Sequence, residues 1–207
     1  KKQFEITSEA SLALKKHLLE NSFDHLILTV GRLVPQKDIF TLLNAAKIVR
    51  QSEPRTRFII IGDGYQKEEL FYYSKKIGML KNIEFIREVT YANIPSYFNA
   101  CDLFVLSSAY EDTARVLIEA AAAGKAIVST NTTGADDIVQ TGKNGYLVPI
   151  KDYFQMGNKI RYLLKNKQMR DQFGLKSKEI IKDRFNESEL ITYMLDSWIY
   201  ALDNNQS

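Results

Sequence analysis

The segment HLILTVGRLVPQKDIFTLLNAAKIVRQSEPRTRFIIIG, residues 25–62, holds two apolar runs with a helical pattern between them. The runs over 25–30 and 57–61 read as buried strands. Residues 38–51 place apolar side chains at spacings of three and four, and the pattern stops before Pro54. Because strands joined through a crossover helix run parallel, the segment predicts a β-α-β unit.

The same alternation continues along the chain. Further strands are expected at 83–86, 103–106, 126–129 and 145–148, and further helices at 8–19, 66–77, 94–100, 113–123 and 135–140. After Pro149 the pattern changes to helical stretches at 151–165, 168–184 and 187–202, without another strand. We therefore predict an α/β fold, a Rossmann-like doubly wound parallel sheet with C-terminal helices. It forms one domain over residues 1–203, with a disordered tail at 204–207.

The composition excludes several classes of protein. The chain of 207 residues has a net charge of +3, and its basic residues are spread out, which argues against nucleic acid or a membrane surface as partner. The single cysteine, Cys101, rules out an internal disulfide and is expected to be a core thiol. No apolar run has the roughly 20 residues of a membrane span, and the start shows no signal segment. Neither histidine has metal-ligand spacing, so no metal or cofactor is expected.

Basic residues occur where ligands bind in such a sheet, beyond the carboxyl ends of the strands. The loop after the first strand contains Arg32 and Lys37 and leads into a helix. A forked guanidinium and an ammonium can together hold a diphosphate. The sequence equally allows both residues to be solvated surface charges.

The segment Glu111–Glu119 follows the fourth strand. Backbone amides at Ala114, Arg115 and Val116 would open the next helix and face an anion. Glu119 lies in a helix that is apolar almost all round, and a carboxylate buried there without partners is costly. Ribose hydroxyls would supply hydrogen bonds. The alternative is a structural glutamate bonded to neighbouring backbone or to a lysine.

Two further turns leave other functions open. The Gly62-Asp63-Gly64 turn lacks a third glycine at dinucleotide-fingerprint spacing, which speaks against a dinucleotide-dependent oxidoreductase. The hydroxyls of Thr130–Gly134 either contact a ligand or cap the next helix. A nucleotide-sugar-binding module without catalysis and an epimerase on a related sheet remain alternatives.

Taken in order, these motifs resemble glycosyltransferase family 4, the retaining NDP-sugar transferases of GT-B fold. Val30–Lys37 resembles the family's first loop, Phe58–Gly64 its second strand and glycine-rich turn, and Ala100–Ser108 its fourth strand. Glu111–Glu119 matches the family's E-x7-E element, and Asn144–Pro149 continues the pattern. The resemblance covers nearly the whole chain and identifies it as the C-terminal, donor-binding half of a GT-B fold.

The resemblance implies a role for each candidate residue. Arg32 and Lys37 would bind the donor diphosphate and stabilise it as it leaves, with help from the amides of Ala114–Val116. Glu111 would lie against the transferred sugar, so it joins these two cations as a catalytic residue. Glu119 would bind the ribose hydroxyls.

Gly64 would line the donor site, and Val89 would lie near the base. The sequence departs from the family's pattern in three places: the family often has glycine at Asp38 and at Arg87, and Phe-Gly at Thr113-Ala114. The charge of Asp38 would repel a phosphate at its helix terminus.

The implied reaction transfers a sugar from an NDP donor (UDP, GDP or ADP) to an acceptor hydroxyl with retention and without a metal. The family's N-terminal acceptor domain has no counterpart here, and the chain begins at Lys1 without Met, so we expect it to be an inactive part of a longer protein. The 187–202 helix, with Tyr193, Trp198 and Tyr200, would cross onto that domain. We expect a saccharide or lipid-linked acceptor, a role in bacterial surface polysaccharide or lipopolysaccharide synthesis, and a cytoplasmic location, with peripheral association with the inner membrane as an option.

Overall fold

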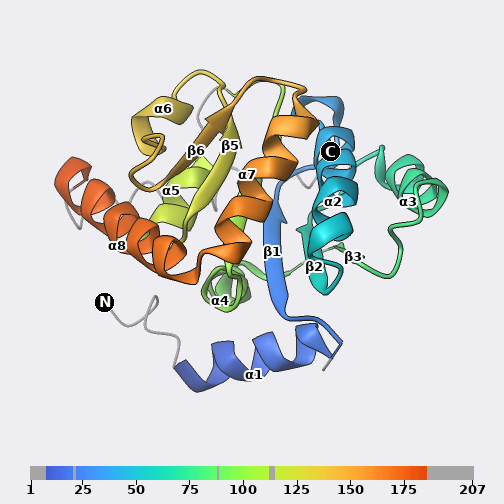
Figure 1. Cartoon of the computed structure of the whole chain (residues 1–207), viewed down its shortest axis with the longest axis horizontal. Helices are drawn as coiled ribbons and strands as arrows, with labels where there is room; N and C mark the ends of the chain where they lie inside the picture. The colour runs from blue at the N-terminus through green and yellow to red at the C-terminus, as the bar shows by residue number, and fades with distance from the viewer. Residues whose placement is uncertain (1–7, 21, 88, 112–114, 186–207) are drawn as a thin grey trace.

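A computed structural model describes residues 8–20, 22–87, 89–111 and 115–185 of the protein. Within these ranges six parallel strands form one sheet in the order β3-β2-β1-β4-β5-β6, with helices on both faces (Figure 1). The strands are β1 (His25–Val30), β2 (Thr56–Ile61), β3 (Ile83–Ile86), β4 (Leu103–Leu106), β5 (Ile127–Thr130) and β6 (Gly145–Val148). The helices are α1 (Ser8–Leu19), η1 (Pro35–Lys37), α2 (Ile39–Ser52), α3 (Lys67–Lys76), η2 (Tyr91–Asn93), α4 (Ile94–Ala100), α5 (Arg115–Ala122), α6 (Ala135–Ile138), α7 (Tyr153–Lys165) and α8 (Lys167–Arg184).

The strands send alternate side chains into two hydrophobic cores, one on each face of the sheet. In β2, Phe58 and Ile60 join the core beneath α2 and α7, whereas Ile59 and Ile61 join the core beneath α4 and α5. Figure 1 shows α2 and α7 side by side over the near face, and these two helices pack on each other. Strands buried on both faces read as continuous apolar runs, which is why the sequence pattern was decisive.

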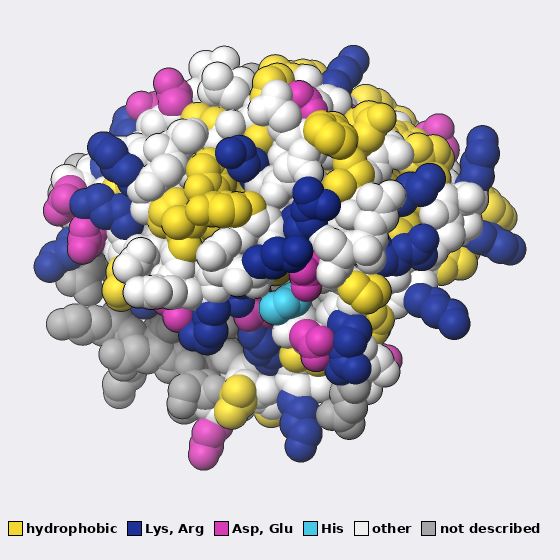
Figure 2. Space-filling model, viewed as in Figure 1, with side chains coloured by type: hydrophobic (Ala, Val, Ile, Leu, Met, Phe, Trp, Pro, Cys, Tyr) yellow, Lys and Arg dark blue, Asp and Glu magenta, His cyan; other side chains and the backbone are white. Residues whose placement is uncertain are grey.

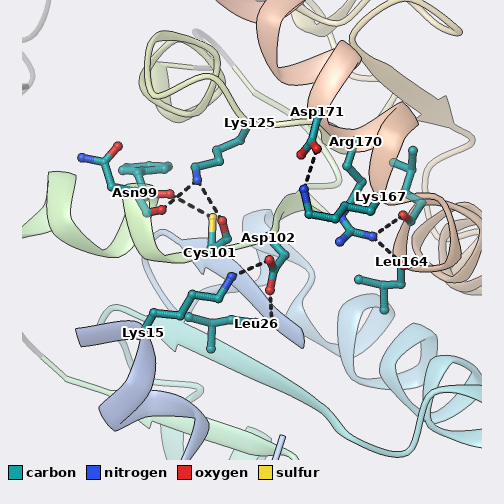
Figure 3. A network of polar contacts seen from close by, with 12 residues as sticks. Lys15, Leu26, Asn99, Cys101, Asp102, Lys125, Leu164, Lys167, Arg170 and Asp171 are labelled. Atoms are coloured by element: carbon teal, nitrogen blue, oxygen red, sulfur yellow. Dashed lines mark hydrogen bonds and ion pairs between the residues drawn. The ribbon is translucent and has the colours of Figure 1, made fainter. Parts of the chain in front are cut away.

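Polar contacts connect the chain at the amino-terminal ends of the central strands (Figure 3). Asp102, just before β4, accepts hydrogen bonds from Lys15 Nζ at 2.5 Å and from the Leu26 amide at 2.8 Å, which ties α1 to β1 and β4. Lys125 Nζ donates to the Cys101 carbonyl at 2.8 Å. Burial raises the pKa of the Cys101 thiol to about 11, so Cys101 is a core residue, as its apolar surroundings predicted.

The element boundaries correct the sequence predictions by one or two residues. β2 begins one residue early, at Thr56, and β5 lies one residue later than predicted, ending at Thr130. The helix predicted at 135–140 ends at Ile138, because Val139 is extended and the amide of Gln140 donates to Asn144 Oδ1 at 2.7 Å. The predicted helix over 187–202 and the tail lie outside the described residues.

Charge is distributed rather than concentrated on the face seen in Figure 2. Lys and Arg side chains are scattered over it, with acidic and apolar side chains between them. None of the helices in the described ranges combines the length and the apolar character that a membrane crossing demands.

Candidate functional site

The loop after β1 is shaped by η1 and by a left-handed residue. Asp38 follows η1 at φ 41° and ψ 52° and accepts hydrogen bonds from the amide (3.4 Å) and hydroxyl (2.7 Å) of Thr41. It therefore caps α2, as a short acidic side chain can, in a backbone conformation that favours glycine. A carboxylate already occupies this helix terminus, so α2 offers a poor place for a phosphate.

The loops after β1 and β2 are in direct backbone contact. The amide of Leu33 donates to the Asp63 carbonyl at 2.8 Å, and the amide of Gln66 donates to the Leu33 carbonyl at 3.1 Å. A Cβ atom at Gly64 would lie 2.4 Å from the Leu33 carbonyl oxygen, and Gly64 has a φ of +155°. Gly64 is therefore required for the close approach of the two loops.

An ion pair fixes the start of the loop after β3. Arg87 Nε lies 2.6 Å from Asp63 Oδ2, and this hydrogen bond lowers the pKa of Asp63. Val89, predicted to lie near the base, is half-buried against the core beneath α4 and α5. Arg87, a position where this sequence departs from the family's pattern, thus contacts the loop after β2.

The loop after β1 also docks onto the loop after β4. The amide of Ala109 donates to the Gln36 carbonyl at 2.8 Å, and Ser107 Oγ donates to the Lys37 carbonyl at 2.9 Å. Lys37 Nζ then lies 2.6 Å from Glu111 Oε1, and both side chains are largely buried. Two residues 74 positions apart in the sequence meet here because β1 and β4 are neighbours in the sheet.

Buried hydroxyl groups support this pair. Ser108 Oγ donates to Glu111 Oε1, the oxygen that Lys37 also binds. Thr130 Oγ1, at the end of β5, donates to the Ser108 carbonyl at 2.6 Å. The Thr130 hydroxyl therefore bonds to the end of the neighbouring strand and does not cap the helix that follows.

Glu119 is buried in α5, with 9% of its surface exposed. Desolvation raises the pKa of its carboxyl group to about 7, and Arg115, one turn earlier, offsets this only in part. No hydrogen-bond donor among the described residues reaches the carboxylate, so the alternative of a structural glutamate satisfied by backbone or a lysine has no counterpart there. Glu119 is thus buried, as the apolar helix predicted, and the described residues donate no hydrogen bond to its carboxylate.

The remaining candidate residues lie at another position of the loop after β1 and at the start of α5. Arg32 is exposed in the loop after β1, and within the described chain no acidic group pairs with it. Arg115 and Val116, both half-buried, form the first turn of α5. Ala114 lies outside the described residues. The structure thus joins Lys37 to Glu111 directly and leaves Arg32 free of that pair.

Sequence reasoning missed the supporting hydroxyls. Ser107 and Ser108 were visible only as two small polar residues after an apolar strand, which is also typical of an ordinary loop. Among the described residues no three His, Cys, Asp or Glu side chains are placed to share one cation.

Comparison with known proteins identifies the family. A family model described as "Glycosyl transferases group 1" matches residues 12–180. The chain belongs to the group 1 glycosyltransferases. This agrees with the resemblance that its motifs suggested.

Curated relatives are similar to this group 1 chain over only part of their length. Spore coat protein SA of Bacillus subtilis is 30% identical over 168 residues, which is 77% of this chain and 45% of that protein. The capsular polysaccharide biosynthesis glycosyltransferase CapM of Staphylococcus aureus is 27% identical over 183 residues, 88% of this chain and 47% of CapM. The chain therefore spans about half the length of the curated relatives it matches.

Solved structures confirm the fold of this group 1 domain. Anabaena Alr3699/HepE in complex with UDP-glucose matches with a TM-score of 0.82 at 24% identity, covering 96% of this chain and 55% of that one. The C-terminal domain of LpcC from Francisella tularensis matches with a TM-score of 0.72 at 22% identity, covering 82% of this chain and 91% of that one. The Rossmann-like half of a GT-B fold, expected from the sequence, is the fold observed.

Proposed function

We propose that this domain binds an NDP-sugar for a retaining glycosyltransferase, which transfers the sugar to an acceptor hydroxyl. The observation that carries the proposal is the contact of Lys37 with Glu111 at 2.6 Å, at the carboxyl ends of β1 and β4. It places a cation suited to a leaving diphosphate beside a carboxylate suited to sugar hydroxyls. Ligands of open parallel sheets bind at such an edge.

Each candidate residue has a task in this proposal. Lys37 and the exposed Arg32 hold the diphosphate and stabilise the negative charge that grows as the sugar departs. The first-turn amides of α5 add to this positive field. Because the carboxylate of Asp38 occupies the amino terminus of α2, the phosphates bind at the amino terminus of α5 instead. No metal is required in this scheme.

The two carboxylates, Glu119 and Glu111, bind the sugar parts of the donor. Glu119 accepts hydrogen bonds from the ribose hydroxyls, which compensate for the desolvation of its buried carboxylate. Glu111 orients hydroxyls of the transferred sugar. Gly64 and Val89 lie beside the base, on the loops after β2 and β3.

The acceptor belongs to the whole protein. Because the chain spans about half of its curated relatives, we propose that a second domain binds the acceptor and completes the active site. Relatives named for capsular and other polysaccharide synthesis support a role in bacterial surface polysaccharide or lipopolysaccharide synthesis. The structure with UDP-glucose supports a UDP-sugar as the first donor to test. We place the whole protein in the cytoplasm or at the inner face of the inner membrane.

Calorimetric titration of the chain with UDP, GDP and ADP tests the donor site. We expect one of them to bind, and Lys37→Ala and Glu119→Ala each to weaken it by about tenfold, the loss of one charge-assisted hydrogen bond. Lys176→Ala, on the exposed face of α8, is the matched control and should bind normally. Failure of all three nucleotides to bind a folded sample would exclude the proposal.

Retention and turnover need the longer protein. With a UDP-sugar and an acceptor, proton NMR of the first product should show the anomeric configuration of the donor. An inverted product would refute retention, and binding without transfer or hydrolysis would favour a module without catalysis.

A further inference from the structure

Consecutive serines after β4 contact both halves of the Lys37–Glu111 pair. Ser107 Oγ donates to the Lys37 carbonyl at 2.9 Å, and Ser108 Oγ donates to Glu111 Oε1. Both serines are fully buried, at 0% exposure. The backbone of Ser108 is held in turn by Thr130 Oγ1 at 2.6 Å, and Thr130 is equally buried. The residues that follow β4 therefore hold both members of the pair, through the backbone of Lys37 on the loop after β1 and through the carboxylate of Glu111 on the loop after β4.

We propose that Ser107 and Ser108 are positioning residues of the donor site, an inference that rests on the proposed function. Ser107 sets the place of the Lys37 backbone. Ser108 keeps Glu111 hydrogen-bonded when the donor diphosphate draws Lys37 away from it.

The second role follows from the shared oxygen. Lys37 and Ser108 both bind Glu111 Oε1, and the residue is only 7% exposed. A diphosphate that binds Lys37 weakens the ion pair and leaves the buried carboxylate to Ser108. Without the serine hydroxyl the same step would leave that carboxylate with no hydrogen-bond donor from the described residues, which is costly in a buried place. Removal of Ser108 therefore penalises diphosphate binding, although the serine does not touch the diphosphate.

A double-mutant cycle separates this role from a merely structural one. Ser108→Ala should weaken binding of UDP, or of whichever nucleotide the wild type binds, by about tenfold, the worth of one hydrogen bond to a charged group. Glu111→Gln should strengthen binding of the sugar-free nucleotide, because the amide competes less for Lys37. In the Glu111→Gln background, Ser108→Ala should change the affinity by less than about twofold.

Ser177→Ala is the matched control. Ser177 is also fully buried, and its hydroxyl donates to the Lys125 carbonyl at 2.7 Å, at the opposite end of β5 from Thr130. The substitution removes this hydrogen bond and the one that Ser177 Oγ accepts from Asn144 Nδ2 at 3.3 Å, both outside the site. Its nucleotide affinity should match the wild type once both are folded.

The ammonium resonance of Lys37 in isotope-labelled chain gives a readout without ligand. Ser107→Ala and Ser108→Ala should each shift this resonance, whereas Ser177→Ala should leave it in place. A Ser108→Ala penalty of equal size in both Glu111 backgrounds, or an unmoved Lys37 resonance in both serine variants, would overturn the positioning role. If no nucleotide binds the wild type, the proposed function fails, and the Lys37 resonance still decides whether the serines position the pair.

Discussion

Replacing Glu119 by Gln should make the protein more stable above neutral pH while weakening nucleotide binding. Burial raises the pKa of Glu119 from 4.5 to about 7. Since one pKa unit corresponds to about 1.4 kcal/mol, the ionised carboxylate destabilises the folded protein by on the order of 3 kcal/mol. For a domain of this size that is a rise in melting temperature of roughly 6–12 °C in the Gln variant.

The gain should depend on pH with a defined sign. Below pH 4.5 the carboxyl group is protonated in both the folded and the unfolded chain, so its contribution vanishes. Between 4.5 and about 7 the unfolded chain ionises first, and the folded protein loses stability as pH rises. Above about 7 the loss is complete. The advantage of Glu119→Gln should therefore grow across this window and then level off.

Urea unfolding followed by circular dichroism, from about pH 5 to about pH 8, measures the difference between variant and wild type. Glu179→Gln, on the exposed side of α8, is the control and should show no comparable trend. Calorimetry at about pH 8 should show weaker nucleotide binding by Glu119→Gln alone. A stability difference that is equal at both ends of the range, or a Gln variant less stable at the upper end, would refute the desolvation argument.

Three further outcomes are expected. Nucleotide binding near pH 7 should release protons from the wild type and not from Glu119→Gln, because the ribose hydroxyls stabilise the ionised carboxylate of Glu119. Calorimetry in buffers of different ionisation enthalpy measures the number of protons released, and equal release by both proteins would contradict the prediction. The Asp38→Gly variant should match the wild type in free energy of unfolding to within about 0.5 kcal/mol, because relief of the left-handed backbone offsets the lost helix cap. The Asp38→Ala variant should lose about 1–2 kcal/mol in urea unfolding. Equal losses in the two variants would show that the φ of 41° carries no strain. The Gly64→Ala variant should lose several kcal/mol of stability, because its Cβ would meet the Leu33 backbone. The Gly142→Ala variant, at φ +80° with open space around it, is the control and should lose only about 1 kcal/mol. Similar melting temperatures of the two variants would refute the loop contact at Gly64.

The fold was predictable because strands buried on both faces leave continuous apolar runs. The runs at 25–30, 83–86, 103–106 and 145–148 match the observed strands. Two of the differences from the prediction arise where a local contact overrides the pattern. The amide of Gln140 is drawn to Asn144, which ends α6 early, and η1 arises at Pro35 without an apolar period to reveal it.

The site was predictable in part, for two different reasons. Glu119 stands out because a carboxylate among apolar helical residues is anomalous in any fold, and its burial is confirmed. The contact of Lys37 with Glu111 needed the order of the strands, which no local pattern encodes. The serines escaped notice because a buried hydroxyl and an exposed one look alike in a sequence.

The place of β1 and β4 in the sheet has a dynamic consequence. Each of them pairs with a strand on both sides, whereas β3 and β6 are edge strands. Edge elements open at lower free-energy cost than central ones, so amide hydrogens of the edges should exchange with solvent first. The loops that contain Lys37 and Glu111 thus follow the two strands that should open last. Local opening of the edge strands should therefore leave β1 and β4, which carry the two loops of the site, in place.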